Sequence, residues 1–146
     1  MTNGKSKKAK KRLLIVASVV IILAIVITAL NLISLQSLLK KGEAYSGLEI
    51  KNQLTPQKDE NGYWYFTTDE DFKIMHLTDI HIGGGFLSKE VDEKALNAVA
   101  TMITKEKPDL VIATGDIAFP VPYMAGTFNN YSGAKAFGNL MESLGV

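Results

Sequence analysis

The hydrophobic pattern sets an apolar N-terminal run apart from the rest of the chain. Leu13 to Leu39 spans 27 residues without a charge, and Leu13–Leu30 is almost wholly apolar, with no polar stripe before Asn31. About 20 apolar residues in a helix cross a hydrocarbon core of roughly 30 Å. A core helix of a soluble protein would normally carry a polar stripe. The pattern therefore predicts a single transmembrane helix over residues 13–33.

The segment that follows is more polar and contains turn signals. Residues 34–71 are predicted to form a connector, in which Leu48–Leu54 and Tyr63–Thr67 have strand character. The stretch between them holds Pro56, Asn61 and Gly62, so the two short strands are expected to form a β-hairpin. The aromatic residues of the second strand are expected to pack against the following domain. The alternative is that they lie on the membrane surface.

From residue 72 onward the pattern indicates a strand, a helix and a second strand. Phe72–Thr78 is a short apolar run, and Ser88 is a plausible N-cap for a helix that continues to about Lys107 and ends before Pro108. Asp109–Thr114 is predicted to be a buried strand, parallel to the first and reached by a right-handed crossover. The expected apolar face of the helix consists of Val91, Ala95, Leu96, Val99, Met102 and Ile103.

A last helix is expected from about Ala134, after an irregular stretch with several prolines and glycines. Its apolar face would consist of Phe137, Leu140, Met141 and Leu144. The predicted organisation is thus a tail over residues 1–12, a membrane span over 13–33, a connector over 34–71 and an α/β domain over 72–146.

Basic residues flank the apolar run unequally. Six precede it, at positions 5, 7, 8, 10, 11 and 12, and only Lys40 and Lys41 follow it closely. The positive-inside tendency then predicts a single-pass protein of the cell membrane, with a cytoplasmic N-terminus and an extracytoplasmic domain. A cleaved signal peptide usually has an apolar run of about 7–15 residues and a small-x-small cleavage site. The longer run and the lack of an Ala-x-Ala site favour an uncleaved anchor.

The formal net charge of +1 is a sum of two oppositely charged parts. Residues 1–42 hold 8 basic residues and no acid, whereas residues 43–146 hold 8 basic and 15 acidic residues, for nets of +8 and −7. A basic tail is also typical of nucleic-acid arms. Because this tail directly precedes the span, attraction to the lipid bilayer is the simpler interpretation, and no nucleic-acid partner is expected.

The composition excludes several classes of site. The chain has no cysteine, which excludes disulfides, Cys-ligated zinc or iron–sulfur centres and a thiol nucleophile. A hydrophobic content of 47% argues against global disorder. The 104 residues that follow the first 42 suffice for one small domain.

Candidate metal ligands follow both predicted strands. Asp79 and His81 come directly after the first strand, and Asp116 comes after the second. The carboxyl ends of parallel strands lie at one edge of a sheet, and residues two apart in extended backbone point to the same side. An imidazole beside carboxylates suits manganese, iron or zinc better than magnesium. His76 lies within the first strand, where a packed or edge-facing histidine is expected, and is assigned no role.

The motifs D-x-H (Asp79, His81) and G-D (Gly115, Asp116) resemble the opening half of the calcineurin-like metallophosphoesterases, as do the surrounding segments HLTDIHIGG and KPDLVIATGDI. The resemblance implies that residues 72–146 are the N-terminal part of a metallophosphoesterase-type α/β sandwich. It also implies a site for two divalent metal ions, in which Asp79 and His81 bind the first metal and Asp116 bridges both. Such a site hydrolyses phosphate esters with a metal-activated water.

The later motifs of that family, G-N-H and G-H-x-H, do not occur in this sequence. Gly138-Asn139-Leu140 begins like the first of them, but it lies in the predicted last helix. The second metal site is therefore expected to be incomplete, as in an N-terminal fragment that binds metal weakly and has little or no hydrolase activity. The alternatives are a pseudoenzyme and a non-catalytic, single-pass binding module.

Overall fold

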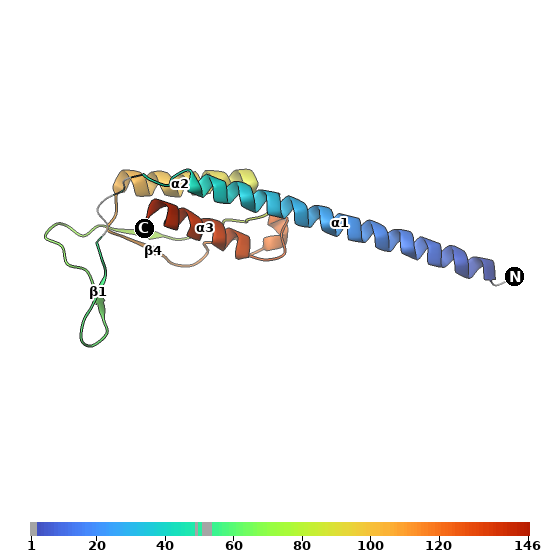
Figure 1. Ribbon diagram of the computed structural model, residues 1–146, viewed down its shortest axis with the longest axis horizontal. Helices are drawn as coiled ribbons and strands as arrows, with labels where there is room; N and C mark the ends of the chain where they lie inside the picture. Colours follow the sequence, from blue (N-terminus) through green and yellow to red (C-terminus); the bar gives the residue numbers. More distant parts are fainter. Residues whose placement is uncertain (1–2, 49, 51–53) are drawn as a thin grey trace.

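The computed structural model describes residues 3–48, 50 and 54–146. A single long helix, α1 (Asn3–Glu43), carries a small domain against its C-terminal part (Figure 1). At 1.5 Å per residue its 41 residues extend about 60 Å, roughly twice the hydrocarbon thickness of a bilayer. Residues 7–26 are all exposed. The described chain thus has one helix long and apolar enough to cross a membrane.

The second part of α1 packs on the domain instead of forming a connector. Ser34, Leu38 and Gly42 are buried at a spacing of four residues, on a face that meets α2 (Lys89–Glu106) and α3 (Tyr131–Leu144). The prediction of a connector from residue 34 is wrong for residues 34–43. Apolar residues continue at helical spacing there, and the first chain reversal comes with Gly47, which has a φ of +82°.

The predicted hairpin is present, but its first strand lies elsewhere. β1 (Gln57–Lys58) pairs antiparallel with β2 (Trp64–Tyr65). The Asp59 carboxylate closes the turn, since its Oδ1 accepts hydrogen bonds from two backbone amides further along the turn. The predicted first strand, Leu48–Leu54, lies largely outside the described residues, and its described members are not in a strand. The turn closed by Asp59 therefore pairs β2 with β1, which is shorter than the predicted first strand and lies later in the chain.

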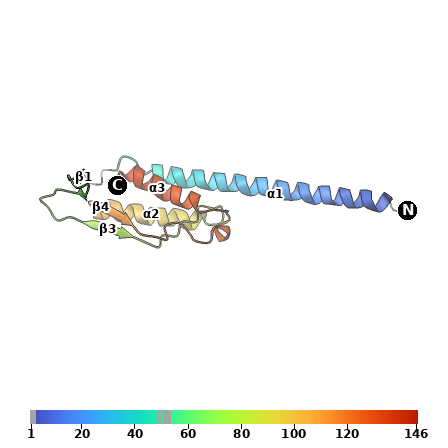
Figure 2. The ribbon, with the colours of Figure 1, turned by 90° about the horizontal axis from the view of Figure 1, so that it is seen from below.

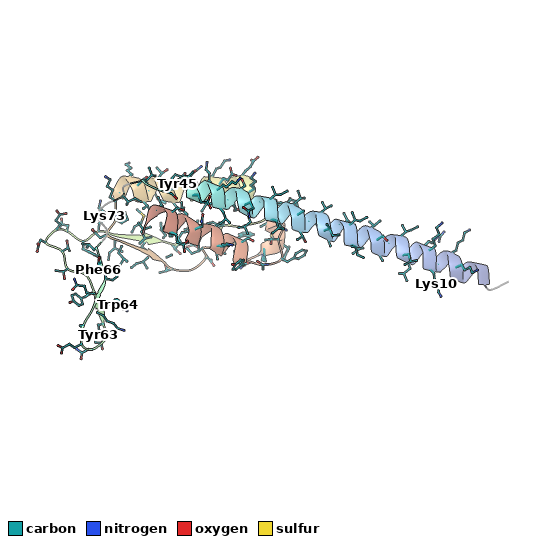
Figure 3. The ribbon with its side chains drawn as sticks, in the orientation of Figure 1. Lys10, Tyr45, Tyr63, Trp64, Phe66 and Lys73 are labelled. Atoms are coloured by element: carbon teal, nitrogen blue, oxygen red, sulfur yellow. The ribbon has the colours of Figure 1, made fainter. Side chains whose placement is uncertain are left out.

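The hairpin aromatics do not pack on the domain. Tyr63 and Trp64 are 72% and 66% exposed, and Tyr65 is also exposed. Figure 3 shows Tyr63 and Trp64 on a hairpin that projects from the end of the domain opposite the extended half of α1. Trp64 contacts Lys58 of the same hairpin, whose Nζ lies 5.4 Å from the ring centre. Phe66 contacts Phe72, with ring centroids 5.4 Å apart. The expected packing is wrong for the first three aromatics.

The strand–helix–strand unit is confirmed. β3 (Ile74–Leu77) and β4 (Leu110–Ala113) pair in parallel, with Ile74 opposite Leu110 and Leu77 opposite Ala113. α2 connects them and ends at Glu106 before a left-handed Lys107 and Pro108, as predicted. The chain is therefore a mixed α/β structure in which helices and small sheets combine with one apolar N-terminal helix.

Helices cover only one face of the β3–β4 sheet (Figure 2). Leu77 and Met75 contribute to the core, whereas Ile74 is 53% and Ile112 39% exposed. The prediction of a buried second strand is wrong, because burial on both faces needs a cover that the described residues do not provide. The buried core cluster consists of Leu38, Ile50, Leu77, Ile82, Leu96, Val99, Ala100, Ile103, Ala136, Leu140 and Leu144.

The buried face of α2 is rotated from the predicted one. Leu96, Val99 and Ile103 are buried as expected, but Val91 and Met102 are 66% and 43% exposed. In the first turn of α2 the buried side chain is that of Asp92 and not that of Val91, as described below. α3 begins three residues earlier than expected, and its predicted apolar face is buried or partly buried. The irregular stretch before it contains the short 3₁₀-helix η1 (Pro122–Ala125).

Truncating Leu38 should loosen the domain from α1. The side chain is fully buried between helices, so Leu38→Ala is expected to lower the free energy of unfolding by about 2–4 kcal/mol. Thermal or denaturant unfolding in detergent micelles measures this loss. Leu32→Ala, at a position 59% exposed on the same helix, should change the stability by less than about 0.5 kcal/mol. Equal effects of the two variants would contradict the docked arrangement.

Candidate metal site

The loops that follow β3 and β4 stay paired beyond the strands. The Thr114 amide donates to the Leu77 carbonyl at 3.0 Å, and the His81 amide donates to the Asp116 carbonyl at 2.9 Å. Pairing then continues to a parallel bridge between Ile82 and Ala118. The segments between these hydrogen bonds hold the candidate ligands. Each loop is thus tied to the other on both sides of the site.

Asp79, His81 and Asp116 converge in the structure. His81 Nε2 lies 3.7 Å from Asp79 Oδ1 and 3.7 Å from Asp116 Oδ2, and one ligand atom from each residue lies within 4.8 Å of the others. At metal–ligand distances of about 2.1 Å, adjacent ligand atoms are about 3 Å apart, so each of the two 3.7 Å separations would shorten by about 0.7 Å around a bound ion. This group, called the triad below, can hold a metal ion.

The backbone of the triad is left-handed, not extended. Asp79, His81 and Asp116 have φ values of 55°, 56° and 46°. For a residue with a Cβ this conformation costs roughly 1–2 kcal/mol, and such strain persists at functional sites where the surrounding structure enforces it. The expected extended arrangement of Asp79 and His81 is therefore wrong, although its consequence, convergence, is present. Three left-handed residues, one at each candidate ligand, accompany the convergence of the side chains.

Gly115 supplies the fourth left-handed residue of the site, with a φ of 76°. A Cβ built on it would meet nothing within 4 Å, so the glycine serves the backbone conformation rather than close packing. The only other described non-glycine residue with positive φ is Lys107, which ends α2. Left-handed non-glycine backbone in the described chain is thus concentrated at the triad.

Two threonine hydroxyl groups lie next to the triad, and that of Thr78 contacts it; the sequence pattern did not predict either role. Thr78 Oγ1 lies 2.7 Å from Asp79 Oδ2 and 3.0 Å from the Thr114 carbonyl, so it can donate to either oxygen. Thr114 Oγ1 pairs with Nε2 of His76, which is exposed on the open face of the sheet. The sequence does contain a signal for these hydroxyl groups, because a threonine follows each apolar run directly, at Thr78 and at Thr114.

A buried carboxylate binds the loop beside the triad that contains Gly83, Gly84 and Gly85, called the glycine loop below. Asp92 is 1% exposed, and its two oxygens accept the amides of Gly83 at 2.9 Å and Gly84 at 2.8 Å. The Ser88 hydroxyl donates to the same carboxylate at 2.7 Å. Ser88 is the N-cap residue of α2, as predicted, but its side chain makes no capping hydrogen bond to the helix. The hydroxyl holds Asp92 instead.

The glycines of this loop make room for protein and not for a ligand. A Cβ on Gly83 would collide with Ser88 Oγ, one on Gly84 with the Gly133 amide, and one on Gly85 with the Ala125 carbonyl. The three glycines therefore permit the close approach of neighbouring segments, mainly of their backbone. They allow η1 and the start of α3 to pack closely on the loop.

A pocket of about 320 Å³ adjoins the triad. His81 borders it, and the His81 ring lies 5.8 Å from the Phe119 ring, which forms another wall. The remaining lining is mainly apolar. This cavity, called the Phe119 pocket below, is lined by His81, Gly83, Leu87, Ser88, Val91, Asp92, Phe119, Met124 and Ala125.

Comparison with known proteins found no matching family model, no matching curated protein and no matching solved structure. The resemblance to calcineurin-like metallophosphoesterases therefore stays a prediction from the D-x-H and G-D motifs. What the structure adds is a ligand set. Two carboxylates and one imidazole meet at the carboxyl edge of two parallel strands, with side chains 65%, 58% and 37% exposed for Asp79, Asp116 and His81.

Replacing Asp92 should displace the glycine loop. In Asp92→Asn one acceptor oxygen becomes an NH₂ group that faces a donor, so we expect a loss of about 2–4 kcal/mol in the free energy of unfolding. Glu90→Gln, an exposed site on the same first turn of α2, is the matched control and should be nearly neutral. Unfolding curves of both variants, with amide exchange at Gly83 and Gly84, test this. Unchanged protection of the two glycine amides would refute it.

Proposed function

We propose that the chain belongs to a membrane-anchored, metal-dependent phosphoesterase and supplies the ligands of one metal ion. The observation that carries this proposal is the convergence of Asp79, His81 and Asp116 on left-handed backbone at the strand ends. Strained backbone at three potential ligands is unfavourable for stability alone. It is the expected cost of a preorganised site.

The donor set favours manganese, iron or zinc. Carboxylate oxygens accept all three ions, and the imidazole nitrogen disfavours magnesium and calcium. Three protein ligands leave positions open, as in catalytic metal sites. A divalent metal bound there would polarise a phosphoryl group and lower the pKa of a water. Within the described residues the ligand group ends at these three, so a second metal, bridged by Asp116 according to the resemblance, would need further ligands.

Residues around the triad support this chemistry. Asp79 and Asp116 are more than half exposed, which leaves them accessible to a substrate. Thr78 orients one Asp79 oxygen, and outer hydrogen bonds of this kind hold metal ligands in position. The open face of the β3–β4 sheet is compatible with a larger metallophosphoesterase-type sandwich, the fold that the motifs imply.

The proposed location is the cell membrane, with the triad on the extracytoplasmic side. The basic residues before the apolar run support this orientation. Lys10 lies near the N-terminal tip of α1, far from the domain (Figure 3). Residues between the basic tip and the docked half of α1 would then lie in lipid.

Because the chain has no cysteine, orientation can be tested with single cysteines. Asn61→Cys in the exposed hairpin turn should react with a membrane-impermeant maleimide on intact cells. Lys10→Cys, also exposed, should react only after the cells are lysed. Labelling of Lys10→Cys and protection of Asn61→Cys on intact cells would establish the opposite orientation.

Metal binding tests the proposed site directly. Mn²⁺ titration of the full chain in detergent, followed by calorimetry or Mn²⁺ electron paramagnetic resonance, should show one weak site. Asp79→Asn, His81→Ala and Asp116→Asn should each weaken it by more than about tenfold, because each removes a ligand. His76→Ala removes the only other histidine and should leave the affinity nearly unchanged.

A phosphate probe then tests the function. Inorganic phosphate should raise the apparent Mn²⁺ affinity of the wild-type chain, and this effect should be absent in Asp116→Asn. Hydrolysis of bis-p-nitrophenyl phosphate with Mn²⁺ is expected to remain close to the metal-only rate, because the second metal lacks its ligands. If Asp79→Asn leaves both Mn²⁺ and phosphate binding unchanged, the non-catalytic binding module is the correct alternative.

A further inference from the structure

The loops around the triad are attached to α1 at the point where its apolar run ends. Asn31 Nδ2 donates to the Gly126 carbonyl at 2.9 Å, and Asn31 Oδ1 accepts the Phe86 amide at 3.2 Å. One turn later, the Ser34 hydroxyl donates to the Gly85 carbonyl at 3.0 Å. The first polar side chains after residues 13–30 are thus the ones that hold the glycine loop and the segment after η1.

These attachments place one end of the domain at the membrane surface. A span of about 20 residues that begins at Leu13 ends close to Leu32, beside Asn31 and Ser34. Figures 1 and 2 show η1 and the starts of α2 and α3 at the end of the domain toward the extended half of α1, with the β1–β2 hairpin at the other end. The carboxyl ends of β3 and β4 are directed toward this membrane-proximal end.

Large apolar side chains are exposed on these same segments. We call Leu87, Tyr123, Met124, Phe128 and Tyr131 the apolar rim; they are 64%, 73%, 63%, 80% and 67% exposed. Clustered exposed apolar residues mark a surface that contacts another phase or partner. Aromatic residues are enriched at the membrane–water interface. Because the rim adjoins the end of the span, its expected partner is the bilayer.

A lysine at the rim fits this environment as well. Lys135 Nζ lies 6.0 Å from the centre of the Tyr131 ring. A long basic side chain over an aromatic ring is suited to the headgroup level, where the ammonium group meets lipid phosphates.

The Phe119 pocket connects the rim to the triad. Leu87 and Met124 belong to both the rim and the pocket lining, and His81 belongs to both the pocket and the triad. Its volume of about 320 Å³ is at the lower end of small-molecule pockets. An amphiphile whose apolar part lies against Leu87 and Met124 would therefore present its polar part at His81.

We infer that the triad receives phosphate esters carried by membrane lipids, with the apolar rim in the bilayer interface and the Phe119 pocket around the glyceryl or proximal acyl part. This inference rests on the proposed phosphoesterase function and specifies its substrate class. A water-soluble phosphate ester would need neither an apolar pocket nor a rim at the level where α1 leaves the bilayer.

The position of the rim can be measured in bilayers with two matched positions. Phe128→Cys and Tyr63→Cys replace aromatic residues that are 80% and 72% exposed, one on the rim and one on the distant hairpin. Each is labelled with an environment-sensitive fluorophore in the full chain, reconstituted in phosphatidylcholine vesicles. Spin-labelled lipids should quench the label at position 128 several-fold more than the label at position 63. Equal quenching would overturn the inference.

The substrate class is tested by metal binding in phosphate-free maltoside micelles. Phosphatidic acid should raise the apparent Mn²⁺ affinity of the full chain about tenfold more than inorganic phosphate does at the same concentration. Oleate, an anionic lipid without phosphate, should have little effect. In the double variant Leu87→Gln/Met124→Gln, the additional effect of the lipid should be lost, whereas the effect of inorganic phosphate should remain.

The outcomes separate the two proposals. If Mn²⁺ binds and inorganic phosphate is as effective as phosphatidic acid, the lipid inference is wrong and the phosphoesterase proposal stands. If oleate is as effective as phosphatidic acid, lipid charge and not the phosphate ester is recognised, which also overturns the inference. If neither phosphate compound affects Mn²⁺ binding, the proposed function itself is wrong.

Discussion

Helix α1 has to satisfy two surroundings along one continuous backbone, and the rest of the structure depends on how it does so. Over residues 13–30 its side chains are almost all apolar, and residues 13–26 are exposed on every side. From Asn31 onward one face carries the polar and small residues that contact the domain. A helix forms all its backbone hydrogen bonds internally, so it can pass from lipid to protein contact without a break. The position of this change determines which end of the domain lies next to the exposed apolar half of α1.

The glycine loop is the element through which α1 and the triad are linked. On one side its backbone is bound by Asn31 and Ser34, and on the other by the buried Asp92. A carboxyl group shielded from solvent needs hydrogen bonds in place of its water, and two amides and one hydroxyl provide them here. The loop is thereby held between α1 and α2, next to His81. Asp79, His81 and Asp116 have strained, left-handed backbone. This surrounding structure and the backbone hydrogen bonds between the two loops hold them in that conformation.

Much of the fold follows from local patterns along the chain. The charge-free run from Leu13, the proline at 108 and the apolar segments on either side of α2 predict a membrane-length helix and a parallel strand–helix–strand unit. The pattern predicts the first hairpin strand at Leu48–Leu54, which has the stronger strand composition. The strand lies at Gln57–Lys58 instead, because the Asp59 side chain closes the turn further along the chain. The burial of β4 was overestimated for a different reason. The composition of a strand shows that it is apolar, but it does not show whether other elements cover both faces of its sheet.

The sequence by itself determined which residues can bind a metal and that they lie at one edge of the sheet, because ligand chemistry is a property of side chains and parallel strands end together. Only the tertiary structure decided how they meet. Asp79 and His81 converge on left-handed backbone, and hydrogen bonds from Thr78 and His81 to the neighbouring loop hold this segment in place. No local pattern in the sequence predicts such long-range pairing. The same holds for Asp92. Its position in the first turn of α2 is typical of an acid that interacts with a helix N-terminus, but its side chain is buried and accepts the amides of Gly83 and Gly84. Its role, like the proximity of the triad to the end of the apolar run of α1, depends on contacts between residues far apart in the chain.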